Sequence, residues 1–255
     1  MSQIVSIHSF RGGTGKSNSV ANIAALMAQK GLRVGVIDTD IQSPGIHVLF
    51  QLDETQIKYS LNDFLWKNCG IEDAAYDVTP NIGENIPGRV FLIPASIKTG
   101  EITRILREGY DVNTLSNGFY YLIDEVGLDV LLIDTHPGLN EETLLSIAIS
   151  NTLLIILRPD QQDYLGTGVT VDIARKLDVP HLGLLVNKVP AAFSEKEISQ
   201  RAETAYECPV AAVIPHADEM MTLASGGIFA MHYPHHRITS AYHQAVNFIL
   251  GDTQT

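Results

Sequence analysis

Residues 9–17 read Ser9-Phe10-Arg11-Gly12-Gly13-Thr14-Gly15-Lys16-Ser17, directly after the apolar run Ile4–His8 and before a helical pattern over Ser17–Gln29. Glycines allow backbone N–H groups to turn inward and form an anion-binding nest at a helix N-terminus, where the helix dipole favours phosphate. The Lys-Ser pair after the last glycine supplies a cation for phosphate oxygens and a hydroxyl ligand for Mg²⁺. This order of strand, glycine loop, Lys-Ser and helix predicts a phosphate-binding loop.

The surrounding chain alternates short apolar runs with amphipathic stretches. Runs of four or five mostly apolar residues without alternation are typical of strands buried on both faces. The runs are Ile4–His8, Val34–Ile37, Val90–Ile93, Val130–Ile133, Leu153–Leu157, Leu182–Val186 and Val210–Ile214, and the helical patterns are Ser17–Gln29, Glu141–Ile149, Gly166–Leu177, Glu195–Ala205 and Thr239–Leu250. Alternation of this kind predicts an α/β fold: one doubly wound, mostly parallel sheet with helices on both faces. We expect only short helices and loops over residues 39–89 and 94–128.

Two further segments place carboxylates at strand ends. A buried strand is followed by Asp38 and Asp40, which point to the same side because they stand at i and i+2. The run Val130–Ile133 leads into Asp134, and its apolar neighbours would fix that carboxylate so that it can hold the Mg²⁺ shell. Ligands of such sheets bind outside the carboxyl ends of the strands. The three acids are therefore candidates for the same site as the glycine loop, and spacing leaves open which of Asp38 and Asp40 matters more.

The glycine loop departs from the usual pattern G-x-x-x-x-G-K-[ST], because Phe10 stands at the first glycine position. It resembles instead the deviant Walker A motif, K-G-G-x-G-K-[ST], of the ParA/MinD family of dimerising ATPases. Arg11 occupies the position of the family's signature lysine, which reaches across an ATP-sandwich dimer to the partner's phosphates, and arginine keeps the charge on a planar fork. The resemblance implies that ATP and Mg²⁺ are cofactors and that the nucleotide is held by Arg11, Gly12, Gly13, Thr14, Gly15, Lys16 and Ser17.

The resemblance extends over nearly the whole chain and implies one P-loop ATPase domain over residues 1–255. Asp38-Thr39-Asp40-Ile41-Gln42 resembles the family's switch I, and Asp134-Thr135-His136-Pro137-Gly138 resembles its switch II. The implied catalytic residues are Lys16, Asp38, Asp40 and Arg11, and the implied metal ligands are Ser17, Asp134 and Asp38. Further along, the resemblance implies nucleotide contacts from Asn187, Pro215 and Asp218.

Three features separate the branches of this family. The segment Tyr242–Thr255 contains no Lys or Arg, so we expect no membrane anchor of the MinD type. Cys69 and Cys208 do not fall in the switch regions, which argues against an iron–sulfur cluster between subunits. Nucleoid-binding members use basic side chains on the ATP dimer, and candidates here are Lys98, Arg104, Arg107, Arg175, Lys176, Lys188, Lys196, Arg201 and Arg237.

Net charge limits how DNA could be held. The chain has 17 Lys and Arg against 29 Asp and Glu, a formal charge of −12, which excludes a broadly basic surface. DNA binding would have to be local, doubled by two-fold symmetry, sensitive to salt and conditional on ATP. The N-terminus lacks the features of a signal peptide, so we expect a cytoplasmic, nucleoid-associated protein.

The sequence thus predicts an ATPase that forms an ATP-sandwich homodimer and positions intracellular cargo on the nucleoid, with an adaptor protein that stimulates hydrolysis. Within the family it looks most like the McdA-type branch that positions carboxysomes, and plasmid or chromosome partition is a close relative of this role. Phe10 and Arg11 keep open a nucleotide-gated binding module with little turnover. A MinD-like division-site regulator and a metabolic enzyme related to amidoligases are further alternatives.

Overall fold

The computed structural model describes residues 2–252, so that Met1 and the last three residues of the tail discussed above, 253–255, lie outside the described residues. Eight strands form one sheet in the order β3-β4-β2-β5-β1-β6-β7-β8, in which every neighbouring pair is parallel except β3 with β4. The strands are β1 (Gln3–His8), β2 (Arg33–Asp38), β3 (Tyr76–Asp77), β4 (Arg89–Ile93), β5 (Val130–Asp134), β6 (Thr152–Leu157), β7 (His181–Val189) and β8 (Val210–Pro215). The predicted doubly wound α/β fold is confirmed.

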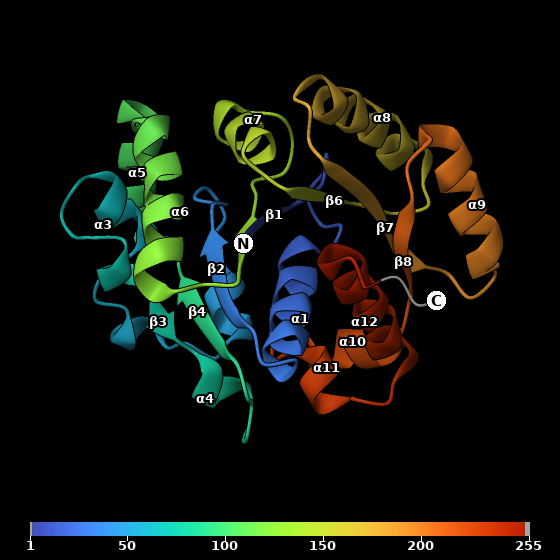
Figure 1. Cartoon of the computed structure of the whole chain (residues 1–255), viewed down its shortest axis with the longest axis horizontal. Coiled ribbons are helices and arrows are strands. Elements are labelled where there is room, and N and C mark those ends of the chain that lie inside the picture. Colours follow the sequence, from blue (N-terminus) through green and yellow to red (C-terminus); the bar gives the residue numbers. More distant parts are fainter. Residues whose placement is uncertain (1, 253–255) are drawn as a thin grey trace.

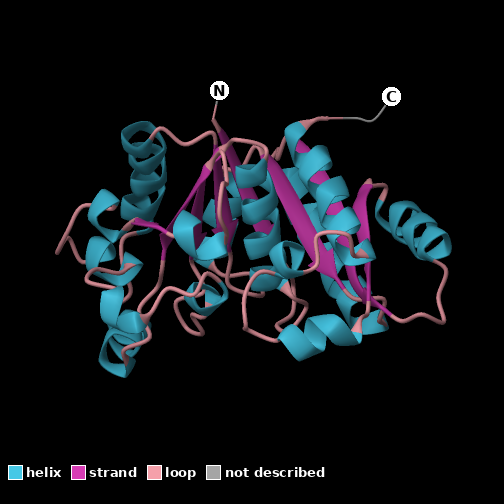
Figure 2. Ribbon diagram, turned by 90° about the horizontal axis from the view of Figure 1, so that it is seen from below, coloured by secondary structure: helices cyan, strands magenta, loops and turns pink. Residues whose placement is uncertain are grey.

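Helices cover both faces of this sheet (Figure 1). The longer ones are α1 (Lys16–Gln29), α5 (Thr99–Glu108), α6 (Val112–Val126), α7 (Glu141–Ala148), α8 (Gln161–Lys176), α9 (Glu195–Tyr206) and α12 (Arg237–Leu250). The shorter ones are α2 (Ile46–Leu49), α3 (Leu61–Leu65), α4 (Thr79–Ile82), α10 (Asp218–Leu223) and α11 (Phe229–His232), with 3₁₀ turns η1 (Glu54–Gln56) and η2 (Glu72–Ala74). In Figure 2, seen from below, one layer of these helices lies in front of the strands.

Alternate residues of the central strands enter different cores. In β5, Val130 and Leu132 pack with α1 and α12, whereas Leu131 and Ile133 pack with α6 on the opposite face. The same alternation in β6 sends Leu153 and Ile155 toward α8 and α9. Each of these strands is therefore buried on both faces, which explains why its sequence is an unbroken apolar run.

One prediction about the helices was wrong. Residues 94–128 contain α5 and the 15-residue α6 rather than only short helices and loops. Gly118 in the middle of α6 lowers the intrinsic stability of the helix by about 1 kcal/mol relative to alanine. A side chain at this position would collide with the ring of Phe64, which lies 2.5 Å from where the Cβ would be. Asp111 caps the helix by accepting the N–H of Asn113 at 2.9 Å. Tertiary packing and a cap thus offset poor intrinsic propensity.

The sheet order places the glycine loop at a topological switch point. From β1 the chain runs through α1 to β2, which lies on one side of β1 in the sheet. From β5 it runs through α7 to β6, which lies on the opposite side of β1. Crevices at such points, outside the carboxyl ends of the strands, are the usual ligand sites of doubly wound sheets. The loops after β1, β2 and β5 converge there.

Candidate nucleotide site

The glycine loop lies between the end of β1 and the start of α1 at Lys16. Gly13 and Gly15 have φ angles of +77° and +99°, in a region that costs a residue with a side chain about 1–2 kcal/mol. A Cβ at Gly15 would also lie 2.5 Å from Nδ2 of Asn187. Both positions therefore need glycine for the loop to keep this backbone.

A cavity of about 380 Å³ opens on the loop and is called the phosphate cavity below. It is lined by residues that begin α1, by residues that follow β2 and by residues of the loop after β5: Gly12, Gly13, Gly15, Lys16, Ser17, Asn18, Asp40, Ser43, His136 and Pro137. Lys16 is only 7% exposed. A buried ammonium group beside unpaired N–H groups at a helix N-terminus makes this cavity attractive to anions.

Asp38 and Asp134 end neighbouring strands and are register partners in the sheet. Each is 1% exposed. Burial, reinforced by the charge of Asp134, raises the pKa of Asp38 well above its ordinary value. Burial also raises the pKa of Asp134 to about 6, although Lys16 and the Ser17 hydroxyl act in the opposite direction. Two buried carboxyl groups side by side repel one another, and a bound cation would relieve that repulsion.

The oxygens present fit a magnesium ion that is shared with a phosphate. Oδ1 of Asp134 is buried and makes no hydrogen bond within residues 2–252, and the Ser17 hydroxyl belongs to the cavity wall. In Asp38, by contrast, Oδ1 accepts the N–H of Asp40 at 3.0 Å and Oδ2 that of Gly45 at 3.2 Å. The described part of the chain contains no group of three or more His, Cys, Asp or Glu that could hold a metal alone, so phosphate oxygens would complete the coordination.

Asp40 lines the phosphate cavity, whereas Asp38 does not. Oδ1 of Asp40 is buried, accepts no hydrogen bond from any described residue and lies 3.8 Å from Nε2 of His136. Burial raises the pKa of Asp40, while Lys16 and His136 oppose the rise. Where spacing left the two acids equivalent, the geometry favours Asp40 as the carboxylate that would meet a water molecule beside the phosphates.

Arg11 lies against the start of α8 and not in the wall of the phosphate cavity. Its guanidinium donates to Oε1 of Gln162, and its Nε is 4.0 Å from Oδ1 of Asp163. Asp163 itself accepts three hydrogen bonds from Arg158: two from the guanidinium, of 2.9 and 3.0 Å, and one from the backbone N–H, of 3.0 Å. Burial would raise the pKa of Asp163, but the hydrogen bonds from Arg158 outweigh it, and the pKa is lowered. In this structure Arg11, at the position of the signature lysine, thus contacts residues of its own chain.

A second cavity, of about 310 Å³, adjoins the first, since Gly15 and Asn18 line both. We call it the base cavity. Asn187 and Pro215 line it, but Asp218 does not, because Asp218 begins α10 with its side chain 99% exposed. Beside Ile214, Ala217 and Tyr242, its apolar wall includes Met220, Met221, Ala224 and Ile238, which sequence reasoning missed. Apolar residues at the end of a strand or on a helix carry no signal that separates a ligand wall from a core.

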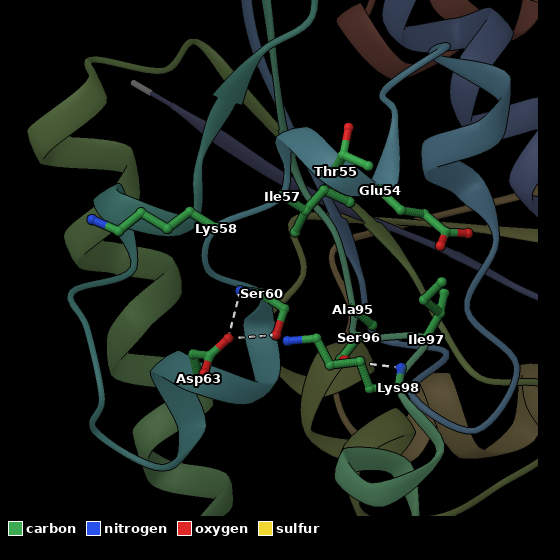
Figure 3. A pocket seen from close by; sticks show the side chains of 10 residues that line it. All are labelled: Glu54, Thr55, Ile57, Lys58, Ser60, Asp63, Ala95, Ser96, Ile97 and Lys98. Carbon is green, nitrogen blue, oxygen red and sulfur yellow. Dashed lines mark hydrogen bonds between the residues drawn. The ribbon is translucent and has the colours of Figure 1, made fainter.

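A third cavity, of about 280 Å³, lies where the chain leaves β4, beside the segment before α3 (Figure 3). Ser60 donates its N–H and its hydroxyl to Oδ2 of Asp63, both at 2.9 Å, and the N–H of Lys98 donates to Oγ of Ser96 at 3.2 Å. The Lys98 ammonium pairs with Glu101 at 3.1 Å. Because these polar groups satisfy one another and line neither nucleotide cavity, the third cavity lends no support to a second substrate of the amidoligase kind.

Most of the cations considered for DNA contact are engaged within the chain. Arg104, for example, pairs with Glu108 at 2.8 Å and lies over the ring of Trp66. Engaged in the same way, with acids, carbonyls or rings, are Lys98, Arg175, Lys188, Arg201 and Arg237. Of the candidate cations, Arg107, Lys176 and Lys196 make no side-chain hydrogen bond, ion pair or ring contact within the described residues. None of the helices in residues 2–252 is long and apolar enough to cross a membrane.

Among proteins of known sequence, an uncharacterized ATP-binding protein of Methanocaldococcus jannaschii is 27% identical over 227 residues, which cover 89% of this chain and 79% of that protein. An iron–sulfur cluster carrier protein of Methanococcus maripaludis is 27% identical over 186 residues, 72% of this chain, and this chain spans only 59% of that relative.

The fold has close counterparts among solved structures. MinD of Pyrococcus horikoshii, solved in complex with Mg-ADP, superposes with a TM-score of 0.80 at 21% identity, covering 97% of this chain and 95% of that one. The family described as the AAA domain matches residues 2–177, which include the phosphate loop and both acidic strand ends. The chain therefore belongs to this AAA-domain family, and its fold is that of MinD.

Proposed function

We propose that the protein is a Mg²⁺-dependent ATPase that dimerises with ATP bound and separates after hydrolysis. The observation that carries this proposal is the continuity of the base cavity with the phosphate cavity across Gly15 and Asn18. One is mostly apolar and the other contains Lys16 and a helix N-terminus. A ligand with a flat apolar end and an anionic end, such as ATP, matches both halves.

Each side chain of the site has a role in phosphoryl transfer. Lys16 and the loop N–H groups would bind the β- and γ-phosphates, and Ser17 with Asp134 would hold Mg²⁺, which neutralises charge on the phosphates. Asp40 would orient the attacking water, and Asp38 would hold the loop that carries Asp40 through its two backbone hydrogen bonds. Phosphoryl transfer depends mainly on positioning and charge stabilisation, so these groups suffice.

Arg11 would act across the dimer. Its guanidinium can reach a partner's phosphates only after it leaves Gln162 and Asp163. The expected result is a slow ATPase whose activity depends on protein concentration. The nucleotide-gated module with little turnover is the competing hypothesis, and it predicts ATP binding without that activity.

Steady-state phosphate release separates the two hypotheses. We expect turnover in the unmodified protein, none above background for Lys16→Ala, and retained ADP binding without turnover for Asp40→Asn. Arg11→Ala should lower turnover and Arg11→Lys should preserve it, because the lysine keeps the charge. Lys67→Ala, at an exposed lysine after α3, is the matched control. An unmodified protein that binds ATP and shows the same background as Lys16→Ala would establish the binding module instead.

We also propose that the ATP dimer positions cargo on non-specific DNA, with an adaptor that stimulates hydrolysis, as in the McdA-type branch. Arg107, Lys176 and Lys196 are the cations that support this role, since their side chains are not engaged within the described ranges. Gel shifts on arbitrary DNA at about 50 mM and 200 mM salt, with and without ATP, test it.

Binding is expected only with ATP, weaker at the higher salt, and lost in the triple variant Arg107→Glu, Lys176→Glu, Lys196→Glu. An ATP dimer that ignores DNA would favour a MinD-like regulator of division instead. Size-exclusion chromatography of the same samples reports whether ATP produces the dimer at all.

A further inference from the structure

Two consecutive residues at the end of β7 both contact the phosphate loop. Nδ2 of Asn187 donates to the carbonyl of Thr14 at 2.7 Å, and Nζ of Lys188 donates to the carbonyl of Gly13 at 2.8 Å. In a regular strand, successive side chains point to opposite faces of the sheet. Two neighbours can therefore reach the same loop only where the backbone departs from the strand geometry.

The backbone makes this departure at Lys188. Its φ angle is +57°, in the left-handed region, and the pairing of β7 with β8 shifts register between Val186 and Val189. The left-handed conformation is energetically unfavourable for a lysine. Bulges of this kind commonly redirect a side chain next to a functional site. Backbone strain persists where surrounding contacts determine it. Two contacts hold it here: the Lys188 N–H donates to Oδ1 of Asn187 at 2.8 Å, and the Lys188 ammonium donates to Gly13.

Lys188 and Asn187 hold the middle of the phosphate loop, whereas other bonds hold its ends, such as the bonds from the Ser9 hydroxyl to the Arg11 carbonyl and from the Ser19 N–H to the Gly15 carbonyl. Gly13 has no side chain and a φ of +77°, and a Cβ added there would meet nothing within 4 Å. A loop N–H can point into the phosphate cavity only if the carbonyls around it point outward. Those of Gly13 and Thr14 are the two that Lys188 and Asn187 hold.

We propose that Lys188 is a positioning residue of the phosphate loop: its ammonium holds the Gly13 carbonyl outward, so that the loop N–H groups face the phosphates. Its side chain also lines the base cavity, so its charge adds to the attraction of the site for an anion. Lys188 is thereby assigned to the nucleotide site rather than to DNA. This inference rests on the proposed binding of ATP at that site.

The first test is the affinity for ADP, measured by calorimetry. Lys188→Met keeps the aliphatic stem and removes the donor, and we expect about tenfold weaker binding, the effect of losing one exposed hydrogen bond from a charged group. Lys188→Arg restores a donor and should bind within about threefold of the unmodified protein. Lys67→Met is the matched control, because Lys67 is also exposed and also has a left-handed φ, of +61°. It should bind ADP normally.

The second test needs no nucleotide. Amide hydrogen exchange of residues 12–17 should be faster in Lys188→Met than in the unmodified protein, with no change elsewhere and an unchanged melting temperature. Unaltered ADP affinity and unaltered exchange would overturn the inference, and so would a loss of DNA binding alone. A general drop in melting temperature, absent from Lys67→Met, would show a global effect and overturn it too. If the unmodified protein fails to bind ADP but the exchange difference is present, the proposed function fails and the role of Lys188 in the loop stands.

Discussion

The side chain of Phe10 rests on the backbone of Gly166 in α8, so closely that a methyl group at Gly166 would overlap three of its carbon atoms. Phe10 stands where the usual phosphate loop has glycine, and here a glycine on another helix provides the space. The neighbouring contact of Arg11 with Gln162 joins the same two segments. The entry of the phosphate loop is thus docked on the first turns of α8.

This docking predicts that Gly166→Ala is destabilising. Overpacking should cost about 1–3 kcal/mol, which exceeds the gain of up to about 1 kcal/mol from replacing a helical glycine. Gly168→Ala, two residues along the same helix, is the control: its Cβ would make an ordinary contact of 3.7 Å with Tyr206 and should stabilise the helix. Urea unfolding measures both. Equal effects of the two alanines would contradict the docking, whereas Phe10→Ala should rescue Gly166→Ala.

Asp134→Asn should stabilise the nucleotide-free protein at pH 7. The carboxyl has a pKa of about 6 in the fold against 3.8 in an unfolded chain, so keeping it charged at pH 7 costs up to about 3 kcal/mol. Between about pH 4 and 6 the folded protein binds a proton at Asp134 that the unfolded chain does not bind. The contribution of Asp134 to the free energy of unfolding therefore falls as the pH rises from about 4 to 6. Thermal melts of the variant should show a gain of several degrees, which Mg-ADP removes. Asp124→Asn, an exposed acid of α6, should show no gain.

His8 predicts the opposite dependence on pH. The Thr135 hydroxyl donates to the carbonyl of Ile7 at 3.1 Å and therefore accepts from Nδ1 of His8 at 2.8 Å. Burial, with the charges of Lys16 and His136, lowers the pKa of His8 to about 3. The unfolded chain binds this proton near pH 6.5, so folding stability falls by up to about 1.4 kcal/mol per pH unit below that value. Between pH 7 and 4.5, His8→Asn should lose less stability than the unmodified protein in denaturant titrations; parallel curves would refute the assignment.

Arg158→Met should be strongly destabilising. It leaves the carboxylate of Asp163, which is 2% exposed, without its two hydrogen bonds from the guanidinium. The carboxylate keeps the backbone N–H of residue 158 at 3.0 Å and Nε of Arg11 at 4.0 Å, so the cost should lie below the roughly 3–5 kcal/mol of a fully unpaired buried charge, and removing both charges should cost far less. Guanidinium unfolding of Arg158→Met and of the double variant Arg158→Met, Asp163→Leu measures the difference. A double variant no more stable than the single one would argue against an unpaired charge as the cause.

Much of the fold can be predicted from the sequence because parallel strands buried on both faces appear as uninterrupted apolar runs. The run Leu153–Leu157 coincides with β6 to within one residue. The two-residue β3 carries no such pattern and was not foreseen. The start of α8 was placed five residues late, since its cap at Asp160 comes before any apolar periodicity.

The site was predictable in its chemistry but not in its contacts. A fixed order of motifs identified Lys16, Ser17 and the acids, because these residues follow strands whose ends share one edge of the sheet. The hydrogen bond from Lys188 to Gly13 joins residues 175 positions apart. It depends on a bulge that no local sequence pattern predicts. The orientation of Arg11 likewise depends on α8, so sequence alone placed this cation beside a partner's phosphates.

The first turn of α1 carries Lys16 and Ser17, and the apolar residues Val20, Ala21 and 23–28 of the same helix are buried in the core that also contains residues of the sheet and of α12. The helix that would bind the proposed nucleotide is therefore also a central part of the core. Ligand occupancy and resistance to unfolding are thermodynamically linked in such an arrangement, and a nucleotide at 100 times its dissociation constant adds about 2.7 kcal/mol. In a cell, the supply of nucleotide would set the lifetime of the protein as well as its state.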